Sequence, residues 1–426
     1  MKIVHLNTYA GNGGAGKACL RLNKALQKQG FNSAVAVNFL FKKNPEVHDL
    51  SNRVGIISKW YTAFGIIMER LIGKIYIGSI PIPFSIPVWG KDVSGREIVK
   101  SADIIHLHWL NHAFLNPANL AQLSKLNKPI VWTFHDSNAF TGGCHVRYSC
   151  DHYQNECGNC PVLKDPDPED MSHTVWIQKE KAYRKLNFSV IAPSKWMAAS
   201  VAKSKLLGDR TVINIPNTLD TDIFQAISKA KARELLGLPA DKFILMSGFM
   251  PSRRDQHKGT PYLIESIEIL IRDYNVNPEE VEMVIFGTRD NSRLPEFPIN
   301  TKFLGTVTSE EKLALCYSAA DVFLAPSLED NLPNTVMESL SCGTPVVAFT
   351  TGGIPDMVEH KYNGYLAEYR SSADFAAGIN WVFSNPERDG LGLNARKSIE
   401  DNFSESIIAQ RHMEVYSSLL NNHVPA

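Results

Sequence analysis

Short apolar runs alternate with stretches of helical periodicity along the whole chain. A run such as residues 321–325 is as short and as continuously apolar as a buried parallel strand. The pattern predicts strands at 3–7, 34–38, 104–108, 130–134, 189–192, 212–215, 243–247, 282–286, 302–304, 322–325 and 346–349. It predicts helices at 15–29, 117–126, 262–274, 310–319, 335–340, 373–383 and 405–420. Strands that alternate with helices indicate α/β domains with parallel sheets.

A chain of 426 residues is too long for one ordinary core, which favours two or three domains. Turn-forming residues cluster at 215–220 and mark the expected join. We therefore expect a first domain at 1–215, with a Cys-rich insertion at 142–162, and a second domain at 216–402. A final helical segment, 403–426, follows the second domain.

The bulk composition changes this picture little. The 44 basic and 44 acidic residues give a net charge of zero, so no bulk attraction to nucleic acid is implied. The N-terminus has no signal-peptide pattern, and no apolar run reaches the roughly 20 residues that span a bilayer. We expect a cytoplasmic protein. The aromatic and apolar stretch 60–89 is a candidate for contact with a membrane surface or an acceptor, or is ordinary core.

The most informative tract is 326–348, which has the pattern strand, loop, helix, glycine stop, strand. In such a unit the loop after the first strand opens at the carboxyl edge of the sheet, where α/β proteins bind ligands. That loop holds Asp330, and Glu338 follows in the helix. A helix N-terminus attracts an anion, and a carboxylate accepts hydrogen bonds from hydroxyl groups. The tract therefore suits a ligand that carries both phosphate and sugar.

This tract resembles the donor-binding signature of retaining GT-B glycosyltransferases of the large family 4, group 1, type. The resemblance implies that Asp330, in place of the usual Glu, holds the transferred sugar and that Glu338 holds the ribose. Pro333 stands where the family often has Gly, and it removes one N–H from the phosphate cradle. The remaining candidate backbone donors are Leu332, Asn334 and Thr335.

The resemblance also implies the fold and the reaction. It implies two Rossmann-like domains facing across a cleft that holds the active site, with the C-terminal helix crossing back to the first domain. The reaction expected is sugar transfer, with retention, from a nucleoside-diphosphate-sugar to a hydroxyl of a glycan or lipid-linked saccharide. The expected setting is assembly of a bacterial surface polysaccharide, and no cofactor is expected for catalysis.

A basic loop follows the predicted strand 243–247. Cleavage of a sugar–diphosphate bond leaves growing negative charge on the diphosphate, which fixed cations stabilise most in the transition state. The resemblance implies an Arg and a Lys separated by four residues, which Arg253 and Lys258 match. Arg254 is the alternative arginine, and a solvated loop is the alternative interpretation.

Two further elements match the family in order along the chain. His135 emerges at the end of strand 130–134, where the family places a His beside the transferred sugar. A neutral imidazole there could hydrogen-bond a sugar hydroxyl, and His106 and His108 end the preceding strand. The nucleobase is expected near Gly305 and Thr306, after strand 302–304.

A glycine-rich loop, 11–16, follows the first strand. A P-loop requires a Ser or Thr where Ala18 stands, and a dinucleotide site requires an acid after the second strand, where none occurs. The interpretation that remains is a loop that closely approaches a phosphate or sugar through Gly13, Gly14 and Gly16, or a structural turn.

Four of the seven cysteines fall in the 142–162 insertion, and the last two form a C-x-x-C pair. Four thiolates can complete a closed tetrahedral zinc site, and zinc is favoured over two disulfides in a reducing compartment. The candidate ligands are Cys144, Cys150, Cys157 and Cys160. Free thiols remain the third possibility. The resemblance extends to a subgroup with such a Cys-rich insertion, without implying a role for it.

Two rival functions remain open. A nucleotide-sugar epimerase with a similar two-domain plan would consume a nucleotide-sugar without an acceptor. A non-catalytic sugar-nucleotide binding protein would bind without turnover, and the retained Arg and Lys count against it.

Overall fold

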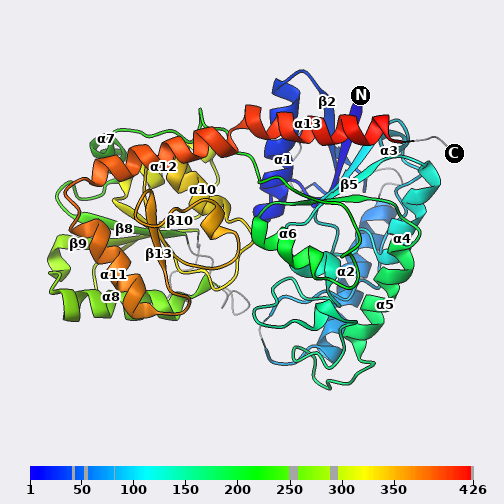
Figure 1. Cartoon of the computed structure of the whole chain (residues 1–426), viewed down its shortest axis with the longest axis horizontal. Coiled ribbons are helices and arrows are strands. Elements are labelled where there is room, and N and C mark those ends of the chain that lie inside the picture. The colour runs from blue at the N-terminus through cyan, green and yellow to red at the C-terminus, as the bar shows by residue number, and fades with distance from the viewer. Residues whose placement is uncertain (41–43, 52–55, 81, 249–257, 288–295, 424–426) are drawn as a thin grey trace. The chain divides into compact units, whose positions relative to one another are not determined.

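The computed structural model describes residues 1–40, 44–51, 56–80, 82–248, 258–287 and 296–423. The chain forms two compact units (Figure 1). Unit 1 consists of Met1–Thr218 together with the chain from Ile408 onward, and unit 2 is Leu219–Ile407. Each unit is built around its own parallel sheet and its own core.

Unit 1 has a seven-stranded parallel sheet in the order β3-β2-β1-β4-β5-β6-β7. The strands are β1 (Lys2–Tyr9), β2 (Asn32–Phe39), β3 (Val47–Asp49), β4 (Ile104–Leu107), β5 (Ile130–Thr133), β6 (Ser189–Ala192) and β7 (Val212–Asn214). Its helices include α1 (Gly13–Lys28), α2 (Ile56–Tyr76), α3 (Glu97–Lys100), α4 (Pro117–Gln122), α5 (Met171–Tyr183) and α6 (Lys195–Ala202). The order reverses between β1 and β4, so a crevice is expected at their carboxyl ends.

Unit 2 has a six-stranded parallel sheet in the order β10-β9-β8-β11-β12-β13. The strands are β8 (Phe243–Gly248), β9 (Val281–Phe286), β10 (Thr301–Gly305), β11 (Val322–Ala325), β12 (Val346–Phe349) and β13 (Gly364–Ala367). Its helices are α7 (Lys229–Leu236), α8 (Thr260–Tyr274), α9 (Glu310–Ala319), α10 (Asn334–Ser341), α11 (Ser372–Phe383) and α12 (Arg388–Phe403). Here the order reverses between β8 and β11.

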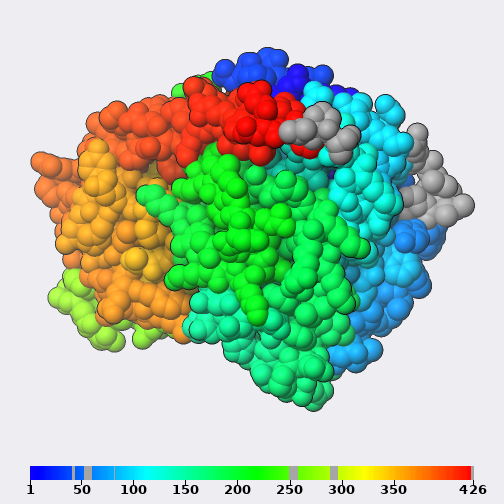
Figure 2. Space-filling model, turned by 45° about the vertical axis from the view of Figure 1, so that its right-hand side comes forward, coloured from blue at the N-terminus to red at the C-terminus, as the bar shows by residue number. Residues whose placement is uncertain are grey.

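The last helix, α13 (Glu405–Asn421), returns the chain to unit 1. The Tyr416 hydroxyl lies 2.6 Å from His106 Nδ1 on β4, and Arg411 donates to the Asn214 carbonyl at the end of β7. Figure 2 shows this end of the chain, in red, lying against the blue and cyan N-terminal part of unit 1. Polar contacts to β4 and β7 therefore fix α13 on the first unit.

All the predicted strands are present, and both sheets are parallel as predicted. The pattern missed the short edge strands β3 and β13 and the helices α2, α3, α5, α6, α7 and α12. The predicted helix 117–126 is shorter, because α4 ends at Gln122 and continues as a 3₁₀ turn, Leu123–Leu126.

Candidate active site

The carboxyl edge of unit 2 brings Lys258 and Asp330 together at the point where the strand order reverses. Lys258 follows β8 and Asp330 follows β11, and the two strands are neighbours in the sheet. Lys258 Nζ lies 2.6 Å from Asp330 Oδ2, with the Lys side chain 42% and the Asp side chain 20% exposed. Both groups are therefore reachable from solvent at the edge where parallel sheets bind ligands.

Two glycines allow the loops that carry this pair to pack tightly. Gly259 has φ +68°, and a Cβ there would lie 1.8 Å from the Pro326 carbonyl oxygen. Gly352 has φ +55°, and its Cβ would lie 1.8 Å from the Asp330 carbonyl oxygen. Any side chain at either position would push the Lys258 or the Asp330 loop away.

Helix α10 begins directly after the Asp330 loop. Asn334 and Thr335 are its first residues, and Pro333 at the N-cap provides no side-chain hydrogen bond. Leu332 has its side chain in the unit 2 core. Glu338 is buried, and its Oε2 accepts a hydrogen bond from the Tyr317 hydroxyl at 2.8 Å. The predicted ribose-binding acid therefore faces an internal partner that the sequence did not indicate.

The other predicted donor residues of unit 2 are less closely grouped. Gly305 ends β10, two strands from β8, and exposed Thr306 follows it. Arg253 and Arg254 lie outside the described residues. Lys258, Asp330 and the start of α10 are therefore the part of the predicted donor site that the structure brings together.

In unit 1, His135 follows β5 and lies at one end of a buried chain of hydrogen bonds. His135 Nε2 is 3.0 Å from His108 Nδ1, and His108 Nε2 is 3.0 Å from His5 Nδ1. His5 Nε2 is 3.1 Å from the Ser33 hydroxyl, which donates to Asn23 Oδ1 at 2.8 Å. Since the Ser33 proton points to Asn23, each neutral imidazole donates towards Ser33 through Nε2. The chain therefore sets one tautomer for His135, with its proton on Nε2.

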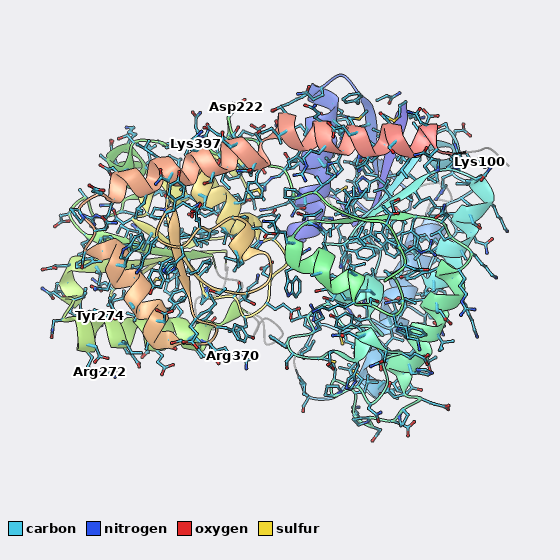
Figure 3. All side chains as sticks on the ribbon, in the orientation of Figure 1. Lys100, Asp222, Arg272, Tyr274, Arg370 and Lys397 are labelled. Carbon is cyan, nitrogen blue, oxygen red and sulfur yellow. The ribbon has the colours of Figure 1, made fainter. Side chains whose placement is uncertain are left out.

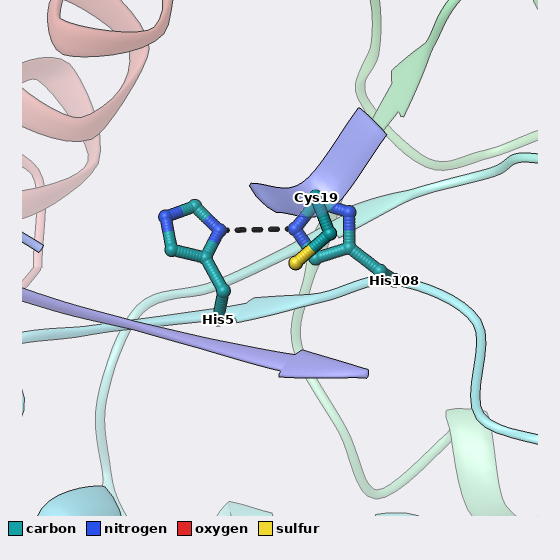
Figure 4. A group of neighbouring side chains, drawn as sticks. All are labelled: His5, Cys19 and His108. Carbon is teal, nitrogen blue, oxygen red and sulfur yellow. Dashed lines mark hydrogen bonds between the residues drawn. The ribbon is translucent and has the colours of Figure 1, made fainter. Parts of the chain in front are cut away.

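His5, His108 and Cys19 of α1 form the one group of three potential metal ligands within 4.8 Å among the described residues (Figure 4). The hydrogen bond between the two imidazoles already occupies both of the nitrogen atoms that would bind a metal. We therefore interpret this group as part of the hydrogen-bonded chain.

Burial keeps the histidines of unit 1 neutral. It lowers the pKa of His135 to about 4, although the nearby Asp136 charge acts in the opposite direction. Burial likewise lowers the pKa of His5 to about 3 and that of His412 to about 4, and it lowers the pKa values of His106 and His108 well below the usual range. At neutral pH, His135 is thus a neutral hydrogen-bonding group.

Asp136 organises the polar side of this site, a role the sequence did not indicate. Its Oδ2 accepts from Trp109 Nε1 at 2.8 Å and from His145 Nδ1 at 2.6 Å, and its Oδ1 accepts from the Asn138 amide. His145 also bonds the Ser85 hydroxyl through Nε2. Burial would raise the pKa of Asp136, but His145 and the other donors outweigh it and lower that pKa. The carboxylate is therefore held charged next to His135.

A small pocket opens at the ends of β4 and β5 in unit 1. The side chains around it include His108, Trp109, Asn111, Thr133, His135 and Asp136. One feature of the sequence could have indicated this cluster. His5 and His106 lie opposite each other on the neighbouring strands β1 and β4, and His108 follows β4 directly. Polar residues on adjacent central strands, where hydrophobic ones are expected, indicate a site.

The glycine-rich loop connects β1 to α1. Gly13 and Gly14 open the helix, and Gly16 lies against the Tyr9 carbonyl in its first turn. The N-cap Asn12 makes no side-chain capping bond. The loop is at the carboxyl end of β1, which is where a ligand-binding loop is expected.

Two doubly wound parallel sheets, with polar groups at the reversal point of each, define the class of two-domain transferases with the GT-B fold. The chain matches a family described as Glycosyltransferase Family 4 over residues 12–223 and one described as Glycosyl transferases group 1 over 241–385. The chain belongs to the group 1, family 4 glycosyltransferases, which use nucleotide-sugars. The predictions of a glycosyltransferase and of the GT-B fold are confirmed.

Relatives of similar length support this membership. An uncharacterized glycosyltransferase of Methanocaldococcus jannaschii is 23% identical over 79% of this chain and 88% of its own length. WcaC of Escherichia coli, a putative colanic acid biosynthesis glycosyl transferase, is 24% identical over 82% of this chain and 83% of its own.

Solved structures show the same fold. Sucrose-phosphate synthase from Thermosynechococcus elongatus has a TM-score of 0.66 and 18% identity, covering 99% of this chain and 100% of that one. HepE of Anabaena, solved with UDP and glucose, has a TM-score of 0.65 and 19% identity, covering 98% and 100%. In the part of the chain that the structure describes, no helix is long and apolar enough to cross a bilayer.

Proposed function

We propose that this glycosyltransferase transfers a sugar, with retention, from a nucleoside-diphosphate-sugar to a hydroxyl of a glycan or lipid-linked saccharide during assembly of a bacterial surface polysaccharide. The observation that carries the donor half of the proposal is the Lys258–Asp330 pair at the reversal point of the unit 2 sheet. Within the family we assign the chain to a subgroup with a Cys-rich insertion, on the cysteine spacing at 142–162.

In the proposed reaction, the bond between the anomeric carbon and the diphosphate oxygen breaks. A bond from the acceptor oxygen to that carbon forms on the same face, and the departing phosphate takes the acceptor proton. Lys258 stabilises the charge that grows on the diphosphate. Asp330 accepts hydrogen bonds from the sugar hydroxyls, so the Lys258–Asp330 contact is exchanged for contacts to the donor. We propose that catalysis needs no metal.

We also propose roles for the other residues that the sequence predicts for the site. Arg253 or Arg254 assists Lys258, and Glu338 holds the ribose. His135 accepts one hydrogen bond from the transferred sugar, since burial keeps it neutral and its Nε2 proton is donated to His108. The backbone N–H groups at the start of α10 bind the diphosphate, because a helix N-terminus attracts an anion. Gly13, Gly14, Gly16, Gly305 and Thr306 bind the remaining parts of the donor.

A panel of labelled UDP-, GDP-, ADP- and dTDP-sugars separates this proposal from its rivals. We expect slow hydrolysis of one donor by the protein alone, and transfer when a membrane saccharide extract is added. An isomerised nucleotide-sugar without release of diphosphate would indicate the epimerase. Binding without any turnover, measured by calorimetry, would indicate a binding protein and contradict the transferase proposal.

We also propose that α2 rests on an anionic membrane surface, where a lipid-linked acceptor resides. Large apolar side chains along one side of this helix are between 41% and 70% exposed, namely Trp60, Tyr61, Phe64, Ile67, Leu71, Ile75 and Tyr76. The spacing places them on one helix face, and exposed apolar faces of this size mark contact sites. Trp89 packs against Gly65, Tyr61 and Phe64 along one edge of this face, and Thr62 on the opposite side is buried.

The charges on α2 favour an anionic lipid surface over a protein partner. Arg70 and Lys74 are exposed on the helix. Its one acid between residues 60 and 76, Glu69, is half-buried and accepts from the Ala113 amide, and burial raises its pKa to about 7. An exposed apolar face with cations and no outward acid is typical of helices that lie in the membrane interface.

Replacing two of these side chains tests the contact. We expect the wild-type protein to float with vesicles of phosphatidylcholine and phosphatidylglycerol at low salt. Ile67→Gln with Leu71→Gln should weaken partitioning by at least about 100-fold, because each buried side chain contributes about 1.5–3 kcal/mol and about 1.4 kcal/mol is tenfold. Leu393→Gln is the control, since Leu393 is a lone exposed leucine on α12. Wild-type protein that stays unbound, or that binds neutral vesicles equally well, would contradict the proposal.

A further inference from the structure

The Cys-rich insertion brings four sulfur atoms into one neighbourhood of unit 1. The Cys144 and Cys160 thiols are hydrogen-bonded to each other, and Cys150 and Cys157 interact electrostatically with both and with each other. The cysteines are free and half-buried or buried. Little regular structure holds this segment, whose one short element among residues 142–163 is the 3₁₀ turn His152–Gln154.

Backbone amides point at three of the four sulfurs. The Gly142 N–H donates to Cys157 Sγ at 3.2 Å. The His152 N–H faces the Cys150 sulfur and the Val162 N–H faces the Cys160 sulfur, while the Leu163 N–H donates to the Cys160 carbonyl at 3.0 Å. N–H groups directed at a sulfur fix its position, as the second shell of a metal site does.

A buried cation lies beside the same sulfurs. Lys179 of α5 is buried and donates to the carbonyls of Asn138 and Thr141. Its electrostatic partners are Cys157, Asp136 and Cys144, and no carboxylate of the described residues lies within 4.0 Å of it. A buried ammonium needs compensating negative charge. Asp136 supplies part of that charge, and thiolates beside Lys179 would add to it, whereas neutral thiols or two disulfides would not.

We propose that Cys144, Cys150, Cys157 and Cys160 bind one zinc ion as a closed tetrathiolate site. The complex carries two net negative charges, which the neighbouring Lys179 partly offsets. In a tetrahedral site with Zn–S bonds of about 2.3 Å, the sulfurs are about 3.8 Å apart. No three of these sulfurs lie within 4.8 Å of one another in the described structure, so at least one sulfur–sulfur distance shortens by more than about 1 Å when the ion binds.

The site connects to the reaction through one neighbouring residue. His145 follows Cys144 in the chain and holds Asp136, which lies next to His135. Zinc thereby fixes the position of His145, a positioning residue for the His135 site. This consequence rests on the proposed function, whereas metal binding itself does not.

Metal analysis of the full chain tests the site directly. Protein expressed without an affinity tag and purified without chelator should contain about one zinc per chain, by the logic of a closed four-ligand site. An organomercurial that blocks thiols should release it to a colorimetric chelator. Replacement by Co²⁺ should give the intense visible bands of tetrahedral thiolate coordination, a readout that does not depend on activity.

Matched cysteine variants locate the ligands. Cys150→Ser and Cys157→Ser should each lose at least half of the metal and lower the midpoint of thermal unfolding. Cys316→Ala changes a buried cysteine of unit 2, and this variant should keep the full metal content and the wild-type midpoint of thermal unfolding. If the Ser variants fail to fold, the Co²⁺ spectrum of the wild-type protein still shows whether the tetrathiolate site exists. Metal-free protein with four alkylatable thiols, or with two disulfides by mass spectrometry, would overturn the site even if transferase activity were normal.

Discussion

Lys258→Ala should lower kcat by about 10²–10³-fold, the loss expected when one fixed donor to a developing anion is removed. The Lys258 ammonium lies at the edge of unit 2 beside Asp330, where the donor diphosphate is proposed to bind. Its charge acts mainly as the sugar–phosphate bond breaks, so kcat should fall more than KM rises. Hydrolysis of the nucleotide-sugar that is active in the panel measures both constants.

The control for this variant is another lysine of unit 2 that pairs with an aspartate. Lys397 of α12 lies 2.8 Å from Asp401, with its side chain 68% exposed (Figure 3). Lys397→Ala should leave turnover unchanged. An exposed ion pair contributes at most about 1 kcal/mol, so both variants should stay folded. Turnover of Lys258→Ala within about threefold of wild type would remove Lys258 from the proposed leaving-group role.

The central strands were predictable because they are buried on both faces and therefore read as continuous apolar runs. The elements that were missed lack that signal. β3 is a three-residue edge strand, and β13 begins with Gly364. Helix α12 is largely polar and contains two glycines, and its buried residues recur only every fourth position, at Leu391, Ala395, Ile399 and Phe403. Tertiary packing, which sequence periodicity does not record, holds it.

Some features of the candidate site could likewise be predicted from the sequence, and others could not. The position of Asp330, Lys258 and His135 after strands could be predicted, since strand ends share one edge of a parallel sheet. The contact between Lys258 and Asp330 could not, because it depends on two loops that are 72 residues apart. The bond between Tyr317 and Glu338, and the role of Asp136, likewise required coordinates, since each depends on which side chains meet.

Unit 1 should lose stability steeply below pH 6.5, because its buried histidines take up protons only when it unfolds. Burial lowers the pKa of His5, His106, His108, His135 and His412 below the unfolded value of 6.5. Below that pH the unfolded state binds more protons, so the free energy of unfolding falls as the pH falls. The stability is complete above about pH 7.5 and is lost towards pH 4.

The expected fall in the free energy of unfolding is large. Each such histidine contributes about 1.4 kcal/mol per pH unit below its unfolded pKa, so five together approach roughly 7 kcal/mol per unit. That is comparable to the whole stability of a typical domain, about 5–15 kcal/mol. Denaturant unfolding at pH 7.5 and pH 5.5, followed by tryptophan fluorescence, measures the difference. Six of the seven tryptophans lie in unit 1, since Trp381 alone falls within Leu219–Ile407.

Single substitutions assign the effect to buried imidazoles. His412→Gln should reduce the pH dependence by about 1.4 kcal/mol per unit, whatever it does to stability at pH 7.5. His48→Gln, at an exposed position on β3, should leave the dependence unchanged. Equal slopes in the wild type and His412→Gln would mean that protons reach His412 in the folded state. The assignment of this part of the pH dependence to a buried, neutral His412 would then be wrong.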